Sequence, residues 1–241
     1  MTPRKYLVAG RQPWNLRHFR EILSQQPGHW DFCSDSQQLN QFPLDQYRYI
    51  FFLHWSEWIP QEILDQCECV CFHMTDVPYG RGGSPLQNLI ARGHRDTVLT
   101  ALKMTAEFDA GPVYAKRPLS LEGSTAEEIF IRASKLSCEM AIDIANNAPT
   151  PTPQTGDPVV FMRRSPADSV LPSDTEDLTT VFDHIRMLDA AGYPPAFLEI
   201  GNLRLEFSRA ALYDGEVRAD VRIRVAEPSN DSDIHPDSEQ T

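Results

Sequence analysis

Residues 71–85, CFHMTDVPYGRGGSP, combine side chains that can move a proton with a turn that can hold them in place. His73 can accept or donate a proton near neutral pH, and Asp76 adds a carboxylate nearby. The glycines permit close approach of the backbone, while Pro78 and Pro85 fix their own φ angles. We therefore expect a defined irregular loop whose polar side chains can face a ligand.

A second acidic segment, FDAG at residues 108–111, follows a predicted strand. Taken alone, Asp109 is typical of a residue that caps the turn before Gly111. Taken alone, His73 is typical of a structural histidine at a strand end. On local sequence alone, a structural role is favoured for both residues.

The cysteines next to His73 raise the alternative of a metal site. Cys67, Cys69 and Cys71 alternate along the chain, with His73 next in the same register. Residues spaced by two on a strand stand about 6–7 Å apart in a row, too spread to converge on one tetrahedral ion. The chain has five cysteines, an odd number that indicates reduced thiols. We expect no metal.

Strands and helices are expected to alternate around these residues. A continuous apolar run at 47–55 is typical of a parallel strand covered on both faces. The expected strands are 5–10, 47–55, 67–73, 96–104, 112–121, 196–200, 203–213 and 216–225, and the expected helices are 14–23, 59–66, 85–93, 124–144 and 176–191. Ser124 and Glu127 form a predicted capping box, and Gly201-Asn202 a two-residue hairpin turn.

This order of elements predicts an α/β fold with a parallel, Rossmann-like sheet that binds ligands at the carboxyl ends of its strands. The predicted catalytic domain spans 1–148, and a proline-rich linker spans 149–158. A small α+β or β-rich domain is expected at 159–226. An acidic tail at 227–241 has almost nothing to bury and is expected to be disordered.

Composition restricts the partners of the chain. Its 241 residues carry a net charge of −12, which opposes a large nucleic-acid surface because phosphate binding needs clustered Lys and Arg. No apolar run approaches the roughly 18 residues of a membrane span, and the start of the chain lacks a signal-peptide pattern. We expect a cytoplasmic protein that binds neither nucleic acid nor membrane.

The segment CFHMTDVPYGRGGSPLQ resembles a signature of the 10-formyltetrahydrofolate-dependent formyltransferases. The positions that match at the family's spacing are His73, Pro78, Arg81, Gly82, Pro85 and Gln87. FDAG is similar to the family's second signature, Leu-Asp-Thr-Gly. Residues 54–64 resemble the segment that lines the folate pocket, and residues 185–197 resemble the start of the C-terminal domain in methionyl-tRNA and amino-sugar formyltransferases.

The resemblance implies an enzyme that moves a formyl group from 10-formyltetrahydrofolate to an amine. It implies that His73 accepts a proton or stabilises the oxyanion, and that Asp109 orients the imidazole and accepts protons through a water. Cys71 stands where the family has an asparagine that donates to the formyl oxygen, and a thiol is a weaker donor. Asn88 is the nearest amide along the sequence.

The ligand-binding residues follow from the same resemblance. Trp55, Trp58, Ile59 and Asp109 are expected to contact the folate, although the two tryptophans are equally typical of core residues. The acceptor is expected to contact a set of polar residues around the catalytic loop, for which structural roles in the turn are the alternative: Thr75, Asp76, Arg81 and Asn88.

A small-molecule amine is the expected acceptor, and an amino sugar carried on a nucleotide is the one we favour. A free amino or aminooxy metabolite is the alternative acceptor. Two rival functions are a non-catalytic folate or nucleotide-sugar binding protein and a formyltetrahydrofolate hydrolase. A homodimer is compatible with all of them.

Overall fold

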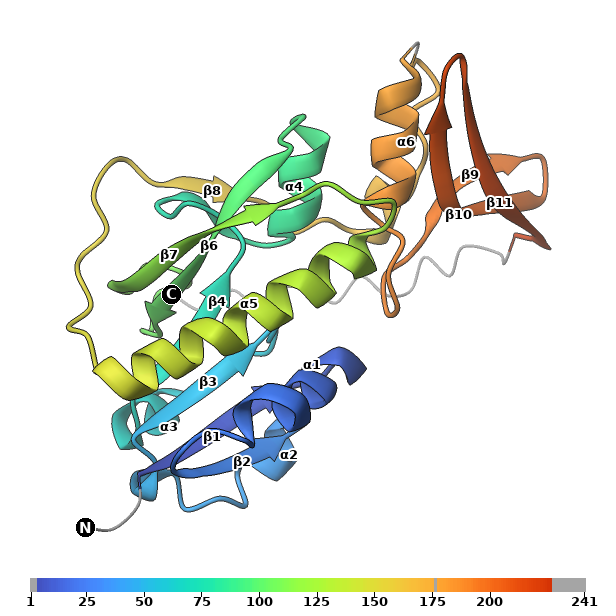
Figure 1. Ribbon diagram of the computed structural model, residues 1–241. Helices are drawn as coiled ribbons and strands as arrows, with labels where there is room; N and C mark the ends of the chain where they lie inside the picture. The colour runs from blue at the N-terminus through green and yellow to red at the C-terminus, as the bar shows by residue number, and fades with distance from the viewer. Residues whose placement is uncertain (1–3, 176, 227–241) are drawn as a thin grey trace, which may run out of the picture.

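A mixed six-stranded sheet organises the first part of the chain in the computed structural model, which describes residues 4–175 and 177–226 (Figure 1). The sheet order is β2-β1-β3-β4-β6-β7. The bounds are β1 Lys5–Gly10, β2 His29–Cys33, β3 Tyr49–Leu53, β4 Cys69–His73, β6 Asp96–Lys103 and β7 Val113–Ser120. The predicted α/β class is confirmed, and β2 is a strand that the sequence pattern did not indicate.

The sheet is parallel only in part. β1 to β4 pair in parallel, but β4 and β6 are antiparallel, as are β6 and β7. The expectation of a parallel sheet is therefore wrong for β6 and β7. The connection 104–112 returns the chain directly, whereas a parallel crossover needs about a dozen residues or more.

Helices cover both faces of the sheet and create two cores. Alternation along β1 sends Tyr6 and Val8 to one core and Leu7 and Ala9 to the other. The first core packs under α1 (Pro13–His18), η1 (Phe19–Leu23) and α5 (Ala126–Asn147), which crosses the sheet in Figure 1. The second packs under α2 (Ser36–Leu39), η2 (Leu44–Gln46) and α3 (Gln61–Gln66).

The cap of α5 differs from the predicted box by one residue. Thr125 is the N-cap, and its side chain accepts a hydrogen bond from the Glu128 N–H. The Glu128 carboxylate reaches back to the N–H of Ser124. The expected pairing of Ser124 with Glu127 is wrong because the helix begins one residue later.

A short parallel pair of strands follows β4 and fixes the glycine-rich turn. β5 (Tyr79–Gly82) pairs with β8 (Val159–Phe161), and α4 (Pro85–Ala91) continues from the turn. Thr152, inside the proline-rich segment, forms a bridge with Val113. The segment that follows α5 therefore folds back onto the loop after β4.

The last part of the chain is a helix packed on a three-stranded antiparallel sheet, β11-β10-β9. After η3 (Pro166–Ser169) come α6 Leu178–Arg186, β9 Ala196–Ile200, β10 Leu203–Tyr213 and β11 Glu216–Val225. The predicted hairpin at Gly201-Asn202 is confirmed, because β9 and β10 pair on either side of it. The predicted acidic tail, 227–241, lies outside the described residues.

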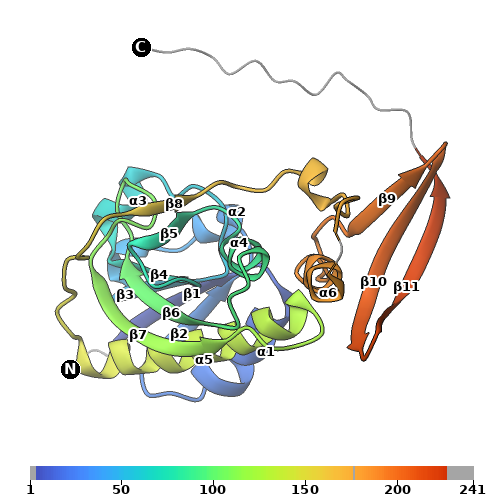
Figure 2. The same cartoon turned by 90° about the horizontal axis from the view of Figure 1, so that it is seen from above.

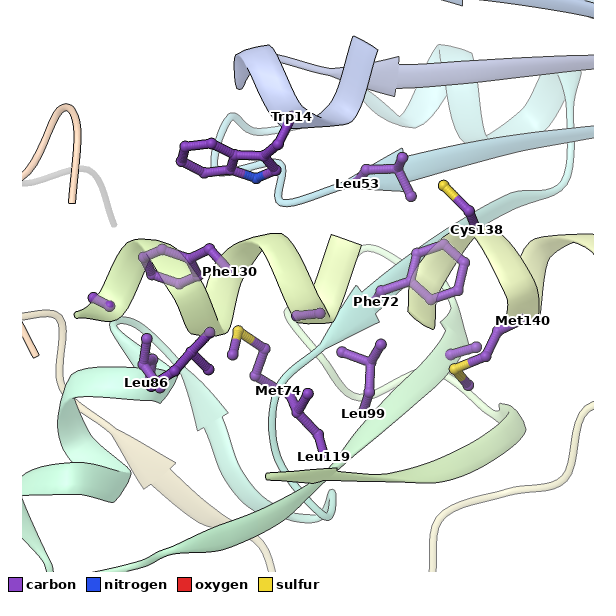
Figure 3. Packing of buried hydrophobic residues seen from close by; sticks show 14 of the residues in the cluster. Trp14, Leu53, Phe72, Met74, Leu86, Leu99, Leu119, Phe130, Cys138 and Met140 are labelled. Atoms are coloured by element: carbon purple, nitrogen blue, oxygen red, sulfur yellow. The ribbon is translucent and has the colours of Figure 1, made fainter. Parts of the chain in front are cut away.

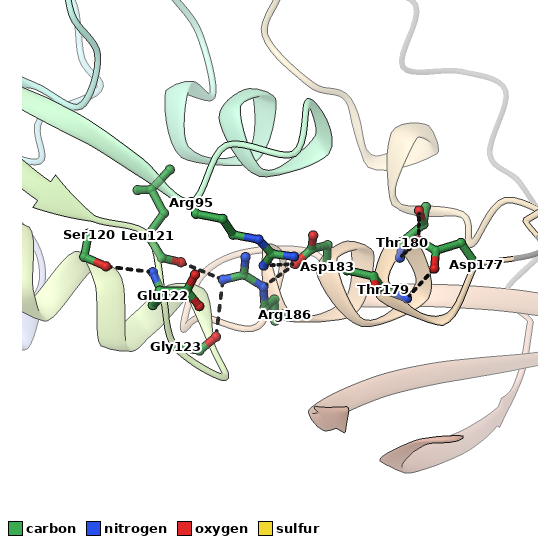
Figure 4. Close-up of polar contacts among 10 residues, drawn as sticks. All are labelled: Arg95, Ser120, Leu121, Glu122, Gly123, Asp177, Thr179, Thr180, Asp183 and Arg186. Carbon is green, nitrogen blue, oxygen red and sulfur yellow. Dashed lines mark hydrogen bonds and ion pairs between the residues drawn. The ribbon is translucent and has the colours of Figure 1, made fainter. Parts of the chain in front are cut away.

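A buried arginine at the end of α6 anchors this helix to the loop after β7 (Figure 4). The Arg186 side chain donates to the Asp183 carboxylate and to the carbonyls of Leu121 and Gly123. Arg95 donates to the same carboxylate at 3.2 Å. Within the described ranges, no helix has the length and apolar character needed to cross a membrane.

Candidate functional site

A cavity of about 520 Å³ lies where the loops after β3 and β4 meet α5. His73 and Asp109 line its polar side, together with Cys71. Its other walls come from segments that are distant in sequence, including 54–57, 82–87 and Tyr193. Figure 3 shows several apolar lining residues beside α5, namely Phe72, Met74, Leu86, Leu99 and Phe130. The cavity thus has one polar side and largely apolar walls elsewhere, which suits a small organic ligand.

The structure brings His73 and Asp109 together from different strand ends. His73 Nδ1 lies 3.4 Å from Asp109 Oδ1, and both side chains are largely buried. Asp109 Oδ2 accepts a hydrogen bond of 2.9 Å from the N–H of Gly82. Asp109 has φ of +52°, a left-handed conformation that aspartate tolerates better than most residues. The carboxylate is therefore held by the glycine-rich turn itself.

The other nitrogen of His73 fixes its tautomer. Nε2 lies 2.7 Å from the carbonyl oxygen of Gly80, and a carbonyl can only accept, so Nε2 carries the hydrogen. In the neutral ring, Nδ1 then has a free lone pair. Its 3.4 Å separation from Asp109 is too long for a well-formed hydrogen bond, so Nδ1 remains able to take a proton. Asp109 is placed to stabilise the imidazolium that results.

Cys71 lines both the larger cavity and a second, smaller cavity of about 40 Å³. Burial raises the pKa of the Cys71 thiol, and the nearby Asp109 charge raises it further. The thiol therefore stays protonated and can act only as a weak hydrogen-bond donor. Among the described residues, no group of three or more His, Cys, Asp and Glu side chains is placed to hold a metal ion.

The residues expected to contact the folate lie around both cavities. Trp55 lines the larger cavity, and its Nε1–H is buried without an acceptor among the described residues. Trp58 and Ile59 line the smaller cavity, where exposed Trp58 packs edge-on against Phe108 at 5.0 Å. Asp109 lines both. Trp55 and Asp109 thus share the larger cavity with His73, whereas Trp58 and Ile59 share only the smaller cavity with Asp109.

The expected acceptor residues Thr75 and Asp76 lie away from the cavity lining. Thr75 is fully buried, and its hydroxyl donates to the same Gly80 carbonyl that His73 contacts. Asp76 is exposed and forms an ion pair with Lys116. Thr75 therefore supports the ring of His73 indirectly, while Asp76 anchors the outer side of the turn.

Arg81 and Asn88 are occupied by contacts within the protein. The Arg81 guanidinium donates to Gln154 at 2.9 and 3.1 Å and to Glu107 at 3.4 Å. The Asn88 amide donates to three backbone carbonyls, those of Gly83, Ser84 and Met162. Asn88 is therefore not available as the amide that replaces the family's asparagine, and neither residue lines the cavity.

A contact between His54 and Tyr193 in the cavity wall was missed by the sequence analysis. His54 Nε2 lies 3.0 Å from the Tyr193 hydroxyl, and the His54 ring packs 4.3 Å from Phe130. Burial lowers the pKa of His54 to about 4 and raises the pKa of Tyr193 to about 12. Both side chains are therefore neutral at pH 7. Their 139-residue separation leaves no local signal in the sequence.

This buried histidine predicts a pH-dependent stability that His54→Asn removes. Between pH 6.5 and 4 the unfolded chain binds a proton at His54 that the folded chain does not, so stability falls as pH falls. Relative to His54→Asn, the wild type should lose roughly 1–3 kcal/mol between pH 7 and 4.5. Asparagine suits the φ of +49° at this position.

Urea unfolding of both proteins at the two pH values measures this difference. Other buried histidines, such as His18 and His184, are present in both proteins and cancel. A constant difference in unfolding free energy across the two pH values would contradict the assignment.

Comparison with known proteins identifies the relatives of the chain. A family profile described as the methionyl-tRNA formyltransferase C-terminal domain matches residues 166–224. A methionyl-tRNA formyltransferase from Campylobacter curvus is 27% identical over 169 residues, covering 69% of this chain and 54% of the relative. The chain thus spans about half the length of the curated relatives it matches.

Solved structures extend the match along most of the chain. A methionyl-tRNA formyltransferase from Clostridium thermocellum is 41% identical, with a TM-score of 0.87 over 92% of this chain and 100% of that one. A sugar N-formyltransferase from Shewanella sp. is 14% identical, with a TM-score of 0.63 over 93% and 98% of the two chains, and therefore shares the fold. At 41% identity over nearly its whole length, the chain belongs to the formyltransferase family.

Proposed function

We propose that the chain is an N-formyltransferase that moves a formyl group from 10-formyltetrahydrofolate to the amine of a small molecule. The observation that carries the proposal is the His73–Asp109 pair at the cavity wall. A binding module would need neither residue. The match to a methionyl-tRNA formyltransferase covers 92% of this chain.

The cavities suit the folate that the family implies. A buried Trp55 Nε1–H without an acceptor is a donor that a polar ligand atom can satisfy. The exposed aromatic rings of Trp58 and Phe108 offer a surface on which a flat ring system packs. Trp55, Trp58, Ile59 and Asp109 would hold 10-formyltetrahydrofolate, which when bound supplies the electrophilic formyl carbon.

His73 and Asp109 then divide the proton chemistry. As a neutral acceptor amine attacks the formyl carbon, His73 Nδ1 takes the amine proton, because Nε2 is fixed as a donor to Gly80. Asp109 stabilises the imidazolium at 3.4 Å. The protonated ring returns the proton to the leaving nitrogen of tetrahydrofolate as the new carbon–nitrogen bond replaces the old one.

The acceptor we favour is a nucleotide-linked amino sugar. Arg163 lines the rim of the cavity and is the one Lys or Arg in the lining among the described residues, so it is placed to meet a phosphate. The acidic chain opposes a polyanionic tRNA, although a relative that is 41% identical is named a methionyl-tRNA formyltransferase. A free amino or aminooxy metabolite would not need Arg163.

We also propose the division of labour along the chain. Residues 1–148 would form the catalytic domain, and 149–158 the linker. Residues 159–226 would form the small C-terminal domain, although β8 at its start pairs with β5 of the first part. Tyr193 then brings the C-terminal domain to the cavity.

Mass spectrometry of candidate acceptors tests the function. The full chain is incubated with 10-formyltetrahydrofolate and a panel of nucleotide amino sugars, free amines and methionyl-tRNA, and one added formyl group is sought. Release of free formate without an acceptor would indicate a hydrolase. Folate binding without any turnover would indicate a binding protein. His73→Ala is the control for non-enzymatic formylation.

Cys71→Ala should lower kcat by less than about tenfold, equivalent to about 1.4 kcal/mol. A strong amide donor to an oxyanion contributes roughly 2.7–4 kcal/mol, and a neutral thiol should supply only a fraction of that. Steady-state kinetics of Cys71→Ala and Cys71→Asn, with folding checked by circular dichroism, measure the effect. A loss of a hundredfold in folded Cys71→Ala would show that the thiol is itself catalytic.

A further inference from the structure

The C-terminal sheet has one covered edge and one open edge. On the β9 side, Val170 forms a parallel bridge with Phe197, and the Leu171 N–H donates to the Phe197 carbonyl. On the β11 side, the described residues contribute no strand. Figure 2 shows β11 at the outer side of the molecule, away from the six-stranded sheet. Every second residue of β11 therefore directs its N–H and C=O outward, ready to pair with another strand.

The side chains of β11 alternate regularly between two faces. One face carries apolar residues, and the other carries an exposed charged row whose members are Glu216, Arg218, Asp220, Arg222 and Arg224. The signs in the row alternate from Glu216 to Arg222. Edge strands are commonly protected by charges that repel a second strand. An alternating row does the opposite in any register that sets unlike charges against each other.

Self-pairing of β11 has few possible registers. Two copies of β11 can pair antiparallel about a two-fold axis perpendicular to the sheet. Such pairing keeps each side chain on its own face of the sheet only if one residue lies at the axis, directly opposite its own copy. With Arg218 or Asp220 on the axis, that residue opposes its own copy. With Val221 on the axis, Arg218 opposes Arg224. Each of these registers places like charges directly opposite, which is destabilising.

The register centred on Ala219 places unlike charges opposite throughout 216–222. Glu216 faces Arg222 of the second copy, and Arg218 faces Asp220 of the second copy, each twice by symmetry. On the apolar face, Val221, which is 47% exposed, comes beside Val217 of the second copy. Val217 packs against the apolar core of its own chain, so the pairing extends that apolar surface over Val221.

We infer that β11 is a dimerisation strand, which pairs antiparallel with β11 of a second copy of this chain about Ala219. The inference follows from the open edge and the charge order, and it does not depend on the proposed activity. Arg222 supports it, because this side chain makes no ion pair with the described residues of its own chain. The two three-stranded sheets would then form one continuous sheet.

Disulfide trapping of the full chain tests the register. Opposed residues in an antiparallel pair have Cα atoms about 4.5–5.5 Å apart, within the range for a disulfide. Ala219→Cys should therefore give a covalent dimer on mild oxidation. Val221→Cys is the matched control, because its two copies would lie about 13 Å apart along the strands. Four of the native cysteines are buried and Cys71 is partly buried, which keeps the background low.

Charge reversal tests the same interface without oxidation. Sedimentation velocity at about 1–100 µM chain should show a dimer for the wild type. Arg222→Glu or Glu216→Arg should weaken association at least about tenfold, by setting like charges opposite at both ends of the pairing. The double exchange Glu216→Arg/Arg222→Glu should restore it. Glu199→Arg on β9 makes the same charge change away from the edge and should leave association unchanged.

Each outcome bears on the inference. Trapping at Ala219 with recovery in the double exchange would support it. A wild type that stays monomeric over the whole concentration range would overturn it. So would a Val221→Cys protein that cross-links as fast as Ala219→Cys, or a dimer that charge reversal leaves unaffected, because either result would place the contact elsewhere. Unchanged circular dichroism of each variant excludes misfolding as the cause.

Discussion

His73→Ala and Asp109→Asn are each expected to lower kcat by at least about a hundredfold, the loss that accompanies removal of a general acid–base group. His73 supplies the lone pair at Nδ1, and Asp109 stabilises the charge that appears there, 3.4 Å away. Asparagine is the informative replacement at 109, because it tolerates φ of +52° and can still accept the Gly82 N–H. Alanine would disturb the turn as well.

The double variant distinguishes cooperation from independence. If the two residues act as one unit, the combined loss should be far smaller than the product of the single losses. The rate of tetrahydrofolate release is measured for the two single variants and the double variant, with each acceptor that mass spectrometry identifies. Asp96→Asn is the control, because this exposed carboxylate lines neither cavity, and kcat should stay within about twofold. Multiplicative losses would show that the pair does not cooperate.

The strands that surround the site were predictable because their patterns are local. β1, β3 and β4 read as apolar runs in the sequence, and they are buried along most of their length. The hairpin at Gly201-Asn202 was predictable because these two residue types favour a two-residue hairpin turn. The meeting of His73 with Asp109 was predictable only through the family signatures, because no local pattern joins residues 36 positions apart.

The missed features depend on partners that lie far away in the sequence. β5 contains two glycines and becomes a strand only because β8, about 80 residues later, pairs with it. β2 is half-buried at the sheet edge, so it lacks the apolar run of a central strand. The Gly80 carbonyl that fixes the tautomer of His73 is a backbone atom, which no residue type identifies.

Arg81 and Asn88 have internal partners that their place in the sequence does not reveal. Both follow His73 closely along the chain, which favoured contact with the acceptor. Arg81 donates to the side-chain carbonyl of Gln154 in the proline-rich segment. Asn88 donates to backbone carbonyls, including that of Met162. That segment reads as a flexible linker from its composition. Gln154 also donates to the carbonyls of Asp109 and Gly111, so it helps to hold the loop that carries Asp109.

Arg186→Met is expected to lower the free energy of unfolding by about 3–5 kcal/mol, because the buried Asp183 carboxylate would keep only the partly exposed Arg95 and two carbonyls would lose their donor. The Arg186 side chain is 1% exposed, and its Nε–H donates to Asp183 at 2.6 Å. Its Nη1 donates to Leu121 at 2.8 Å and Gly123 at 3.2 Å. Methionine would keep much of the aliphatic volume while leaving those carbonyls and the carboxylate without their main donor.

A surface arginine provides the comparison, and a double variant isolates the pair. Arg117 pairs with Glu139 and Asp143 but is 36% exposed, so Arg117→Met should cost less than about 1 kcal/mol. Removing both members of the buried pair, in Arg186→Met/Asp183→Leu, should cost less than the sum of the single changes, since no uncompensated charge stays buried. Urea unfolding of the wild type, Arg186→Met, Asp183→Leu, the double variant and Arg117→Met measures these differences. Because α6 leads directly to Tyr193 in the cavity wall, loosening this clamp should also raise the acceptor KM while the protein is still folded. An Arg186→Met protein as stable as Arg117→Met would mean that α6 is held by its apolar face alone.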